Sequence, residues 1–158
     1  MPDTTEPDTR RWLRRRWRRI AIGVVLVAVL IQLVPYGRDH AARGTTAEPA
    51  WDSPRTRGLF VDACGDCHSN LTKWPWYSNV APISWLTQSD VDGGRRTFNV
   101  STWDTSRHAD VDHMVRAIVD GEMPPIYYKP MHPASRLSKS EQTALIDGLR
   151  RTFAQPAG

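Results

Sequence analysis

The chain has 158 residues, with 21 Lys and Arg, 17 Asp and Glu, and a formal net charge of +4. This length suits one folded domain with an additional segment, and the composition is neither collagen-like nor that of a disordered chain. The excess positive charge lies in residues 1–37, which hold seven arginines and three acidic residues, whereas basic and acidic residues balance in the remainder. The folded part therefore gives no support for nucleic-acid binding, and we expect no nucleic-acid partner.

The arginine-rich start of the chain runs into an apolar stretch from Ile20 to Val34. Counted from Trp17 to Tyr36, the stretch would span about 30 Å as a helix, the thickness of the hydrocarbon core of a bilayer. We therefore predict a transmembrane helix over residues 20–36 behind a cytoplasmic basic N-terminus, residues 1–19. The positive-inside rule then predicts a single-pass protein of the bacterial cytoplasmic membrane, with its N-terminus inside and its folded domain outside.

Two alternatives to a membrane anchor are a cleaved signal peptide and a buried core helix. The residues after the apolar stretch, Pro35-Tyr36-Gly37, make a poor cleavage site. A core helix would not need seven flanking arginines. We interpret the segment as an uncleaved anchor, followed by a linker over residues 37–51.

Residues 52–155 are predicted to form one all-α domain with long loops. A helix is expected from Ser53 to Ala63, and a second from Asp110 to Asp120, where apolar residues follow helical spacing up to a glycine stop at Gly121. Residues 70–105 are rich in Trp, Pro, Ser, Asn and Gly without a sustained period, and are predicted to form mainly loops. A proline-rich loop over 122–137 leads to a last helix, residues 138–153, opened by a capping box at Ser138.

The only two cysteines lie in the pentapeptide Cys64-Gly65-Asp66-Cys67-His68. In one helical turn this spacing presents two thiols that can reach the two vinyl groups of a haem, and an imidazole that can ligate its iron. The alternatives are a zinc site, a plain disulfide and a thioredoxin-like redox pair. Zinc would need a second pair of Cys or His ligands at suitable spacing, and a thioredoxin-like pair would need a βαβ context. The motif therefore predicts one covalently attached haem c, with His68 as an iron ligand.

The surroundings of the motif resemble class I cytochromes c. Gly58 and Phe60 precede the attachment motif in its helix, and Met123-Pro124-Pro125 lies in a loop ahead of the last helix. A narrower resemblance, to the bacterial haem-binding-domain family, rests on the attachment motif with the following Ser-Asn, on the Trp-Pro-Trp-Tyr-Ser run at 74–78, on Ala-Pro at 81–82, on Gly-Arg at 94–95 with Asn99 through Trp103, and on Met-Pro-Pro at 123–125. This resemblance implies a small cytochrome c-like helical domain with one haem, commonly behind an N-terminal membrane segment.

Met123 is the predicted ligand on the opposite face of the iron. It lies in a loop that can fold over the haem ring, and a thioether ligand raises the potential in a manner that suits electron transfer. Met131 and His132, in the same loop, are the next candidates. Met114 lies on an amphipathic stripe and is better explained as a core residue.

Several other side chains are expected in the haem pocket. Trp74, Trp76 and Tyr77 are predicted to wall the haem, although filling of the core explains them about as well. Arg95 could pair with a haem propionate, and Tyr127 and Tyr128 are expected near Met123.

These expectations combine into a membrane-anchored monohaem c-type cytochrome that carries electrons on the outer side of the cytoplasmic membrane. We expect a redox protein partner and no enzymatic turnover of a substrate. The alternatives are a haem-based sensor or ligand-binding module, or a peroxidase-like protein, with an open sixth position on the iron.

Overall fold

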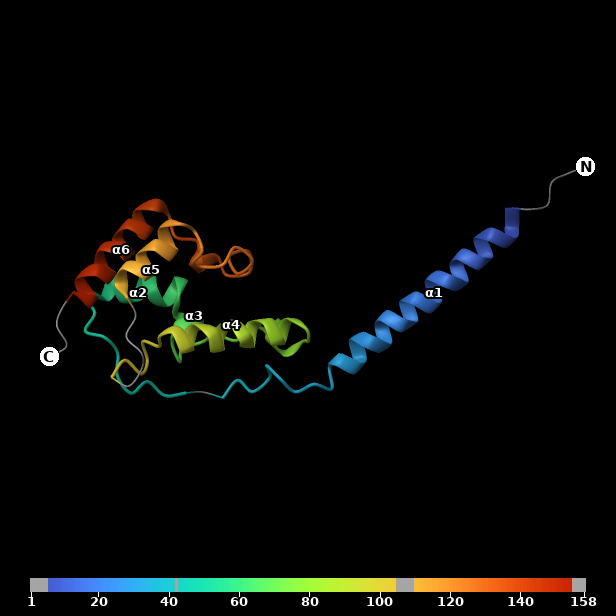
Figure 1. Ribbon diagram of the computed structural model, residues 1–158, viewed down its shortest axis with the longest axis horizontal. Helices are drawn as coiled ribbons and strands as arrows, with labels where there is room; N and C mark the ends of the chain where they lie inside the picture. Colours follow the sequence, from blue (N-terminus) through green and yellow to red (C-terminus); the bar gives the residue numbers. More distant parts are fainter. Residues whose placement is uncertain (1–5, 42, 105–109, 155–158) are drawn as a thin grey trace, which may run out of the picture.

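The computed structural model describes residues 6–41, 43–104 and 110–154, and these residues form helices joined by loops (Figure 1). Within these ranges no strand is present, and one isolated bridge joins Ala47 to Thr102. The predicted all-α character of the domain is thus confirmed. The elements in chain order are α1 (Glu6–Ile31), α2 (Pro54–Ala63), α3 (Gly65–His68), the 3-10 helix η1 (Trp76–Asn79), α4 (Ile83–Thr97), α5 (Val111–Val119), the 3-10 helix η2 (Pro133–Ser135) and α6 (Lys139–Phe153).

Helix α1 corrects the prediction of a membrane-spanning segment. Among the described residues, no helix is both long enough and apolar enough to cross a membrane. The arginines occupy the first half of α1, and the part after Arg19 ends at Ile31. That part has 12 residues, about 18 Å of helix against a hydrocarbon core of about 30 Å. The prediction of a transmembrane helix over 20–36, and with it the single-pass membrane localisation, is therefore wrong.

The apolar stretch outlasts α1 because the chain turns toward the domain at Gln32. The backbone N–H groups of residues 32–34 donate to carbonyl groups three residues back, as in a tightening last turn. The Gln32 side chain then exchanges two hydrogen bonds with the backbone of Ala81, at 2.9 and 3.0 Å. Figure 1 shows α1 extending away from the other helices.

Three helices of the domain begin and end where their sequence signals predict. Ser53 caps α2 by accepting a hydrogen bond from the Thr56 N–H, and Asp110 caps α5. The capping box of Ser138 and Glu141 opens α6. The glycine stop after α5 is confirmed as well, since Gly121 has a left-handed φ of +76°.

Helix α4 was not predicted, because residues 70–105 were expected to form mainly loops. It is a 15-residue helix that carries Gly93 and Gly94 near its end, and its buried residues are Ser84 and Val91. A helix whose buried face is this small and polar lacks the apolar periodicity on which helix prediction relies. The 3-10 helix η1 is a single short turn in the same region.

The core lies between α2, α5 and α6, with the segment after α4 packed against it. Its buried members are Phe60, Phe98, Val100, Met114, Ile118, Leu145 and Leu149. Trp51, for which the sequence indicated no role, packs on this cluster: its ring lies 5.2 Å from that of Phe60 and 6.4 Å from that of Phe153. The packing of α2 on α6 supports the Cys64–His68 pentapeptide, because α2 leads directly into it.

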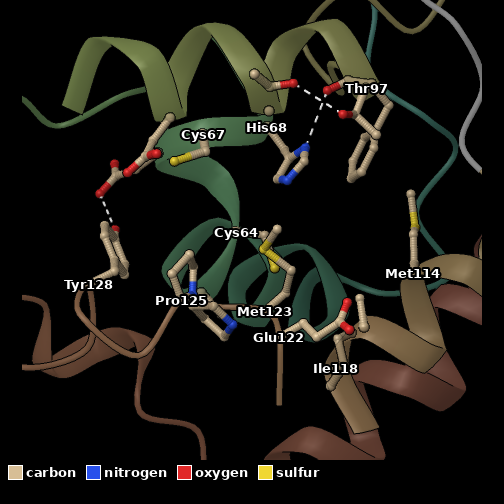
Figure 2. A pocket seen from close by; sticks show the side chains of 18 of the residues that line it. Cys64, Cys67, His68, Thr97, Met114, Ile118, Glu122, Met123, Pro125 and Tyr128 are labelled. Carbon is tan, nitrogen blue, oxygen red and sulfur yellow. Dashed lines mark hydrogen bonds between the residues drawn. The ribbon is translucent and has the colours of Figure 1, made fainter. Parts of the chain in front are cut away.

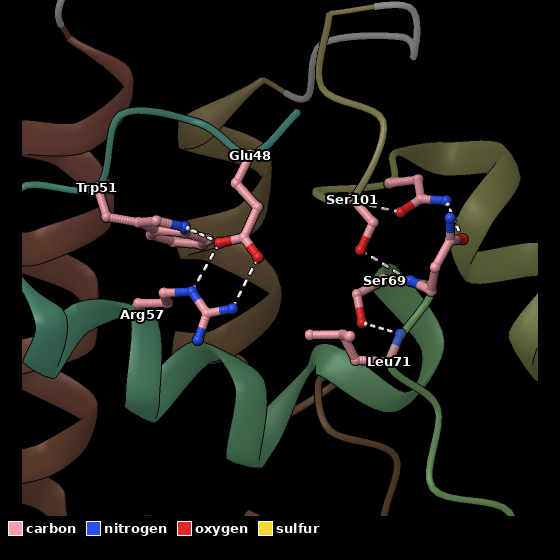
Figure 3. Close-up of polar contacts among 8 residues, drawn as sticks. Glu48, Trp51, Arg57, Ser69, Leu71 and Ser101 are labelled. Atoms are coloured by element: carbon pink, nitrogen blue, oxygen red, sulfur yellow. Dashed lines mark hydrogen bonds and ion pairs between the residues drawn. The ribbon is translucent and has the colours of Figure 1, made fainter. Parts of the chain in front are cut away.

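The segment predicted as a linker, residues 37–51, is hydrogen-bonded to the domain. The Thr46 N–H donates to the Ser101 carbonyl, and the Asn70 side chain donates to the Gly44 carbonyl. Glu48 accepts from the Trp51 indole and from the Arg57 guanidinium, at distances of 2.6 to 2.9 Å (Figure 3). Residues 44–51 thus form an ordered strap, which Glu48 ties to α2 through Arg57.

Candidate functional site

The Cys64–His68 motif forms a single helical turn at the end of α2. Cys64 is the last cap of α2 and the first cap of α3, and its carbonyl accepts hydrogen bonds from the N–H groups of Cys67 and His68 at 3.2 and 2.9 Å. Both thiols and the imidazole line one cavity (Figure 2). One turn of the chain therefore brings both thiols and the imidazole to the same cavity.

The His68 side chain is held in the form that ligates a metal. The ring is buried, with 8% of the residue exposed, and lies parallel to the Phe98 ring at 4.1 Å. Its Nδ1 lies 3.4 Å from the Phe98 carbonyl, which can only accept, so Nδ1 carries the proton and Nε2 keeps its lone pair. Burial lowers the pKa of His68, which favours the neutral ring, although hydrogen bonds to backbone carbonyls act in the opposite direction.

The two cysteines are free thiols that line this cavity. Burial raises the pKa of Cys64 to about 12, and burial with the nearby carboxylates of Asp90 and Asp66 raises the pKa of Cys67 to about 12. Both thiols are therefore protonated at neutral pH. The disulfide alternative is not present in the structure.

The cavity that these groups line has a volume of about 360 Å³, within the range of roughly 300–1,000 Å³ typical of ligand pockets. Its walls come from α2, α3, α4, α5, the loop after α5 and Leu149 of α6. Figure 2 shows the His68 ring pointing into the space from α3, with Met123 and Pro125 on the opposite side. The core residues Phe60, Met114, Ile118 and Leu149 form part of the wall, so the cavity opens directly onto the core.

Met123 reaches the cavity because α5 ends in a tight turn. Gly121 adopts its left-handed conformation there, and the Met123 N–H donates to the Ala117 carbonyl at 2.9 Å. The side chain of Met123 is 41% exposed and lines the main cavity together with a second, smaller one of about 180 Å³. The predicted sixth ligand thus faces His68 across the cavity.

The other ligand candidates occupy different positions. Met114 is buried in the core, as expected, and also lines the cavity. Both ring nitrogens of His132 are engaged, Nδ1 by the Tyr128 carbonyl and Nε2 by the Tyr77 hydroxyl. Met131 is 59% exposed and is not among the residues that line the cavity.

The four side chains predicted to form the haem pocket lie outside the cavity walls. Trp74 stacks on His40 at 4.0 Å, and Trp76 is 75% exposed. Tyr77 bonds to His132, and Arg95 donates to the Ser69 carbonyl and the Thr72 hydroxyl. They lie on or near the segment after the motif, where α4 packs against both α3 and η1. Tyr127 and Tyr128 do line the cavity.

A polar network behind the motif fixes the segment that follows His68. The Ser69 hydroxyl donates to the Gly65 carbonyl and accepts from the Leu71 N–H, while the Ser101 hydroxyl accepts from the Asn70 N–H (Figure 3). The Val100 N–H donates to the His68 carbonyl at 2.9 Å. Residues 98–101 therefore hold the motif and the residues after it in place through hydrogen bonds. Their sequence did not indicate this role.

The side chains that line the cavity are of the kinds that a haem requires. The cavity is lined by two free thiols, by an imidazole with an available nitrogen and by largely apolar side chains, and a thioether faces the imidazole. No group of three or more His, Cys, Asp or Glu residues suited to a metal ion was found in the described part of the chain, which gives the zinc alternative no support.

The helical fold and this cavity define a small haem protein. The chain belongs to the haem-binding-domain family, whose sequence profile matches residues 26–151. The sequence-based assignment to this family is thus confirmed, and with it the binding of haem. No curated protein and no solved structure matched the chain.

Proposed function

We propose that the chain is a monohaem c-type cytochrome that carries electrons to or from a protein partner. Cys64 and Cys67 would attach the haem covalently, His68 would ligate its iron, and Met123 would ligate it from the other side. The observation that carries the proposal is that both thiols, the available His68 nitrogen and Met123 line one cavity, with Met123 facing His68. Haem supplies a reversible one-electron couple, which no side chain of the chain provides.

The two thiols suit covalent attachment because they are free and protonated. Each thiol would add across one vinyl double bond of a bound haem, so that sulfur would bond to one carbon and the thiol proton would go to the other. No net oxidant or reductant is consumed. The role of the chain is to present both sulfurs in one turn, at a spacing set by the hydrogen bonds from Cys67 and His68 to the Cys64 carbonyl.

Electron transfer is favoured by a thioether opposite the histidine. A soft sulfur ligand stabilises ferrous iron and raises the potential, and two protein ligands leave no position for a substrate. The Phe98 carbonyl fixes the orientation of His68, which limits rearrangement when the charge on the iron changes. We therefore propose no enzymatic reaction for this site.

Covalent attachment is tested by denaturing the loaded protein and extracting it with acidified organic solvent. Haem that stays with the chain supports thioether bonds, and a pyridine haemochrome spectrum counts them. We expect two bonds in the parent and one in each of Cys64→Ala and Cys67→Ala. Complete extraction of haem from the parent would overturn the covalent proposal while leaving haem binding intact.

The sixth ligand is tested by comparing two methionines that line the same cavity. Ferric iron bound to Met sulfur has a weak absorption band at the far-red end of the visible spectrum. We expect this band in the parent and in Met114→Ala, and its loss in Met123→Ala together with a lowered potential. A ferrous parent that binds carbon monoxide readily would contradict the proposed ligation.

A second candidate function is a haem-based sensor or ligand-binding module. It is favoured by the 41% exposure of Met123 and by the second cavity at its back, which leaves space for a displaced side chain. The carbon monoxide experiment separates the two candidates.

A further inference from the structure

The loop that carries Met123 is tied to the far side of the cavity by two tyrosines. Its other large apolar residues are exposed, Ile126 at 82% and Met131 at 59%, so burial of these side chains does not hold the loop in place. Tyr127 and Tyr128 instead extend back to α4 and α3 and donate hydrogen bonds to aspartates there.

The Tyr128 bond links the loop to the haem motif itself. Its hydroxyl donates to Asp66 Oδ2 at 2.5 Å, and Asp66 lies between Cys64 and Cys67. The other oxygen of Asp66 accepts the Lys73 N–H at 2.8 Å, which fixes the carboxylate. The Tyr128 ring is in turn stacked on His132 at 3.7 Å, and His132 bonds to Tyr77 of η1. Other contacts thus fix both the carboxylate that accepts this hydrogen bond and the tyrosine ring that donates it.

The Tyr127 bond makes a second, more exposed link. Its hydroxyl donates to Asp90 Oδ2 at 3.1 Å, and Asp90 lies on α4 at the rim of the same cavity. A hydrogen bond to a charged acceptor is stronger when it is shielded from water. The partly buried Tyr128 bond is therefore expected to hold the loop more firmly than the exposed Tyr127 bond.

We propose that Tyr128 and Tyr127 are positioning residues for the sixth ligand: their bonds to Asp66 and Asp90 hold the Met123 loop closed across the cavity. Asp66 thus joins the Cys64–His68 turn directly to the loop that carries the opposing ligand. The inference rests on the proposed function, in which Met123 ligates the iron.

The test is to displace the Met123 sulfur from ferric iron with added imidazole. The loss of the far-red band measures the displacement. Tyr128→Phe removes one hydroxyl and keeps the ring stacked on His132. We expect imidazole to bind about tenfold more tightly to Tyr128→Phe than to the parent, and about two- to threefold more tightly to Tyr127→Phe. Tyr36→Phe is the matched control, because Tyr36 is an exposed tyrosine outside the loop, and its affinity should equal that of the parent.

A double-mutant cycle separates the hydrogen bond from other effects of the substitution. Once Asp90→Ala is present, adding Tyr127→Phe should change imidazole affinity no further, since the bond is already lost. Tyr127 is exposed and Asp90 is half-buried, and neither is a core residue, so the cycle stays available if Tyr128→Phe loads haem poorly. Independent effects of the two substitutions would overturn the Tyr127 assignment.

Failure of the inference can be told apart from failure of the proposed function. A parent without the far-red band overturns Met123 ligation. A parent with the band, and with unchanged imidazole affinity in the double variant Tyr127→Phe, Tyr128→Phe, overturns the positioning role alone. Hydrogen exchange adds a readout that does not depend on the iron: amides of residues 122–132 should exchange faster in the double variant, and equal exchange would also overturn the proposal.

Discussion

Gly94 of α4 lies against the backbone of Cys67, close enough that a Cβ at position 94 would stand 2.5 Å from the Cys67 carbonyl oxygen and 2.9 Å from its Cβ. Only a residue without a side chain allows α4 to approach the Cys64–His68 turn this closely. The contact brings α4 against α3 and sets how far the segment that follows α4, with the Phe98 carbonyl, stands from His68. Gly94 thus determines the geometry of the site without presenting a functional group.

The substitution Gly94→Ala is expected to destabilise the protein by about 2–3 kcal/mol, because the overlap is with backbone and α4 must move. Gly93→Ala is the adjacent control. A Cβ there meets only the Arg96 guanidinium at 3.9 Å, so this substitution should raise the free energy of unfolding by about 0.5–1 kcal/mol, as at an open helix position. Urea denaturation of both variants measures the difference, and equal free energies of unfolding would contradict the close approach.

A second pair of glycines tests the packing of α2 on α6. A Cβ at Gly148 would stand 2.1 Å from the Thr56 hydroxyl oxygen, whereas a Cβ at Gly58 meets nothing within 4 Å. We expect Gly148→Ala to lower the free energy of unfolding by about 1–3 kcal/mol. Gly58→Ala should raise it by about 0.5–1 kcal/mol, as for an open helix position. Thermal melts followed by circular dichroism give both values, and the prediction is wrong if the two variants shift the same way.

Arg95 is predicted to act on stability rather than on the haem. Its guanidinium donates to the Ser69 carbonyl at 3.0 Å and to the Thr72 hydroxyl at 2.9 Å. Arg95→Gln should therefore cost about 1–2 kcal/mol and leave the absorption spectrum and the potential of the loaded protein unchanged. Arg96→Gln, at an exposed neighbouring position, should change neither quantity. A shift in potential confined to Arg95→Gln would instead indicate an electrostatic role near the haem.

The strap before α2 is predicted to weaken in acid. The hydrogen bond from Arg57 lowers the pKa of Glu48 below its usual 4.5, so the carboxylate form is the one that the folded state favours. Its stabilisation is complete above the pKa of the unfolded chain and is lost as the pH falls through the lower folded-state pKa. Glu48→Gln should thus be less stable than the parent by about 0.5–1 kcal/mol near neutral pH, and the difference should shrink in acid. Melting temperatures measured across this range check the prediction, and a constant difference would contradict it.

Local signals are sufficient to predict α2, α5 and α6, because each has a capping residue and apolar residues at helical spacing. The same reasoning fails for α4, where two glycines and a small buried face oppose helix prediction. The adjacent glycines were themselves a signal, since a helix accepts their cost when another backbone approaches closely. Hydropathy along α1 was misleading for a different reason: it records the apolar stretch but not the point at which the chain leaves the helix.

The thiols and the imidazole of the site could be predicted because they are contiguous in sequence. Cys64, Cys67 and His68 lie in one turn, and the Met-Pro-Pro run marks the facing loop. The remaining contacts join residues far apart in the chain, such as Phe98 to His68 and Tyr128 to Asp66. The tryptophans at 74 and 76 were expected in the pocket because they are large and near the motif, yet proximity in sequence does not establish which way a side chain faces.

The cavity shares its wall with the core, since Phe60, Ile118 and Leu149 belong to both. A haem that fills the cavity therefore contacts the same side chains that hold α2, α5 and α6 together. Binding to the folded state alone raises stability by mass action, so the supply of haem controls how much folded protein accumulates. Chains that fail to load would unfold more often and be removed by proteases, and the surviving population would consist of loaded molecules.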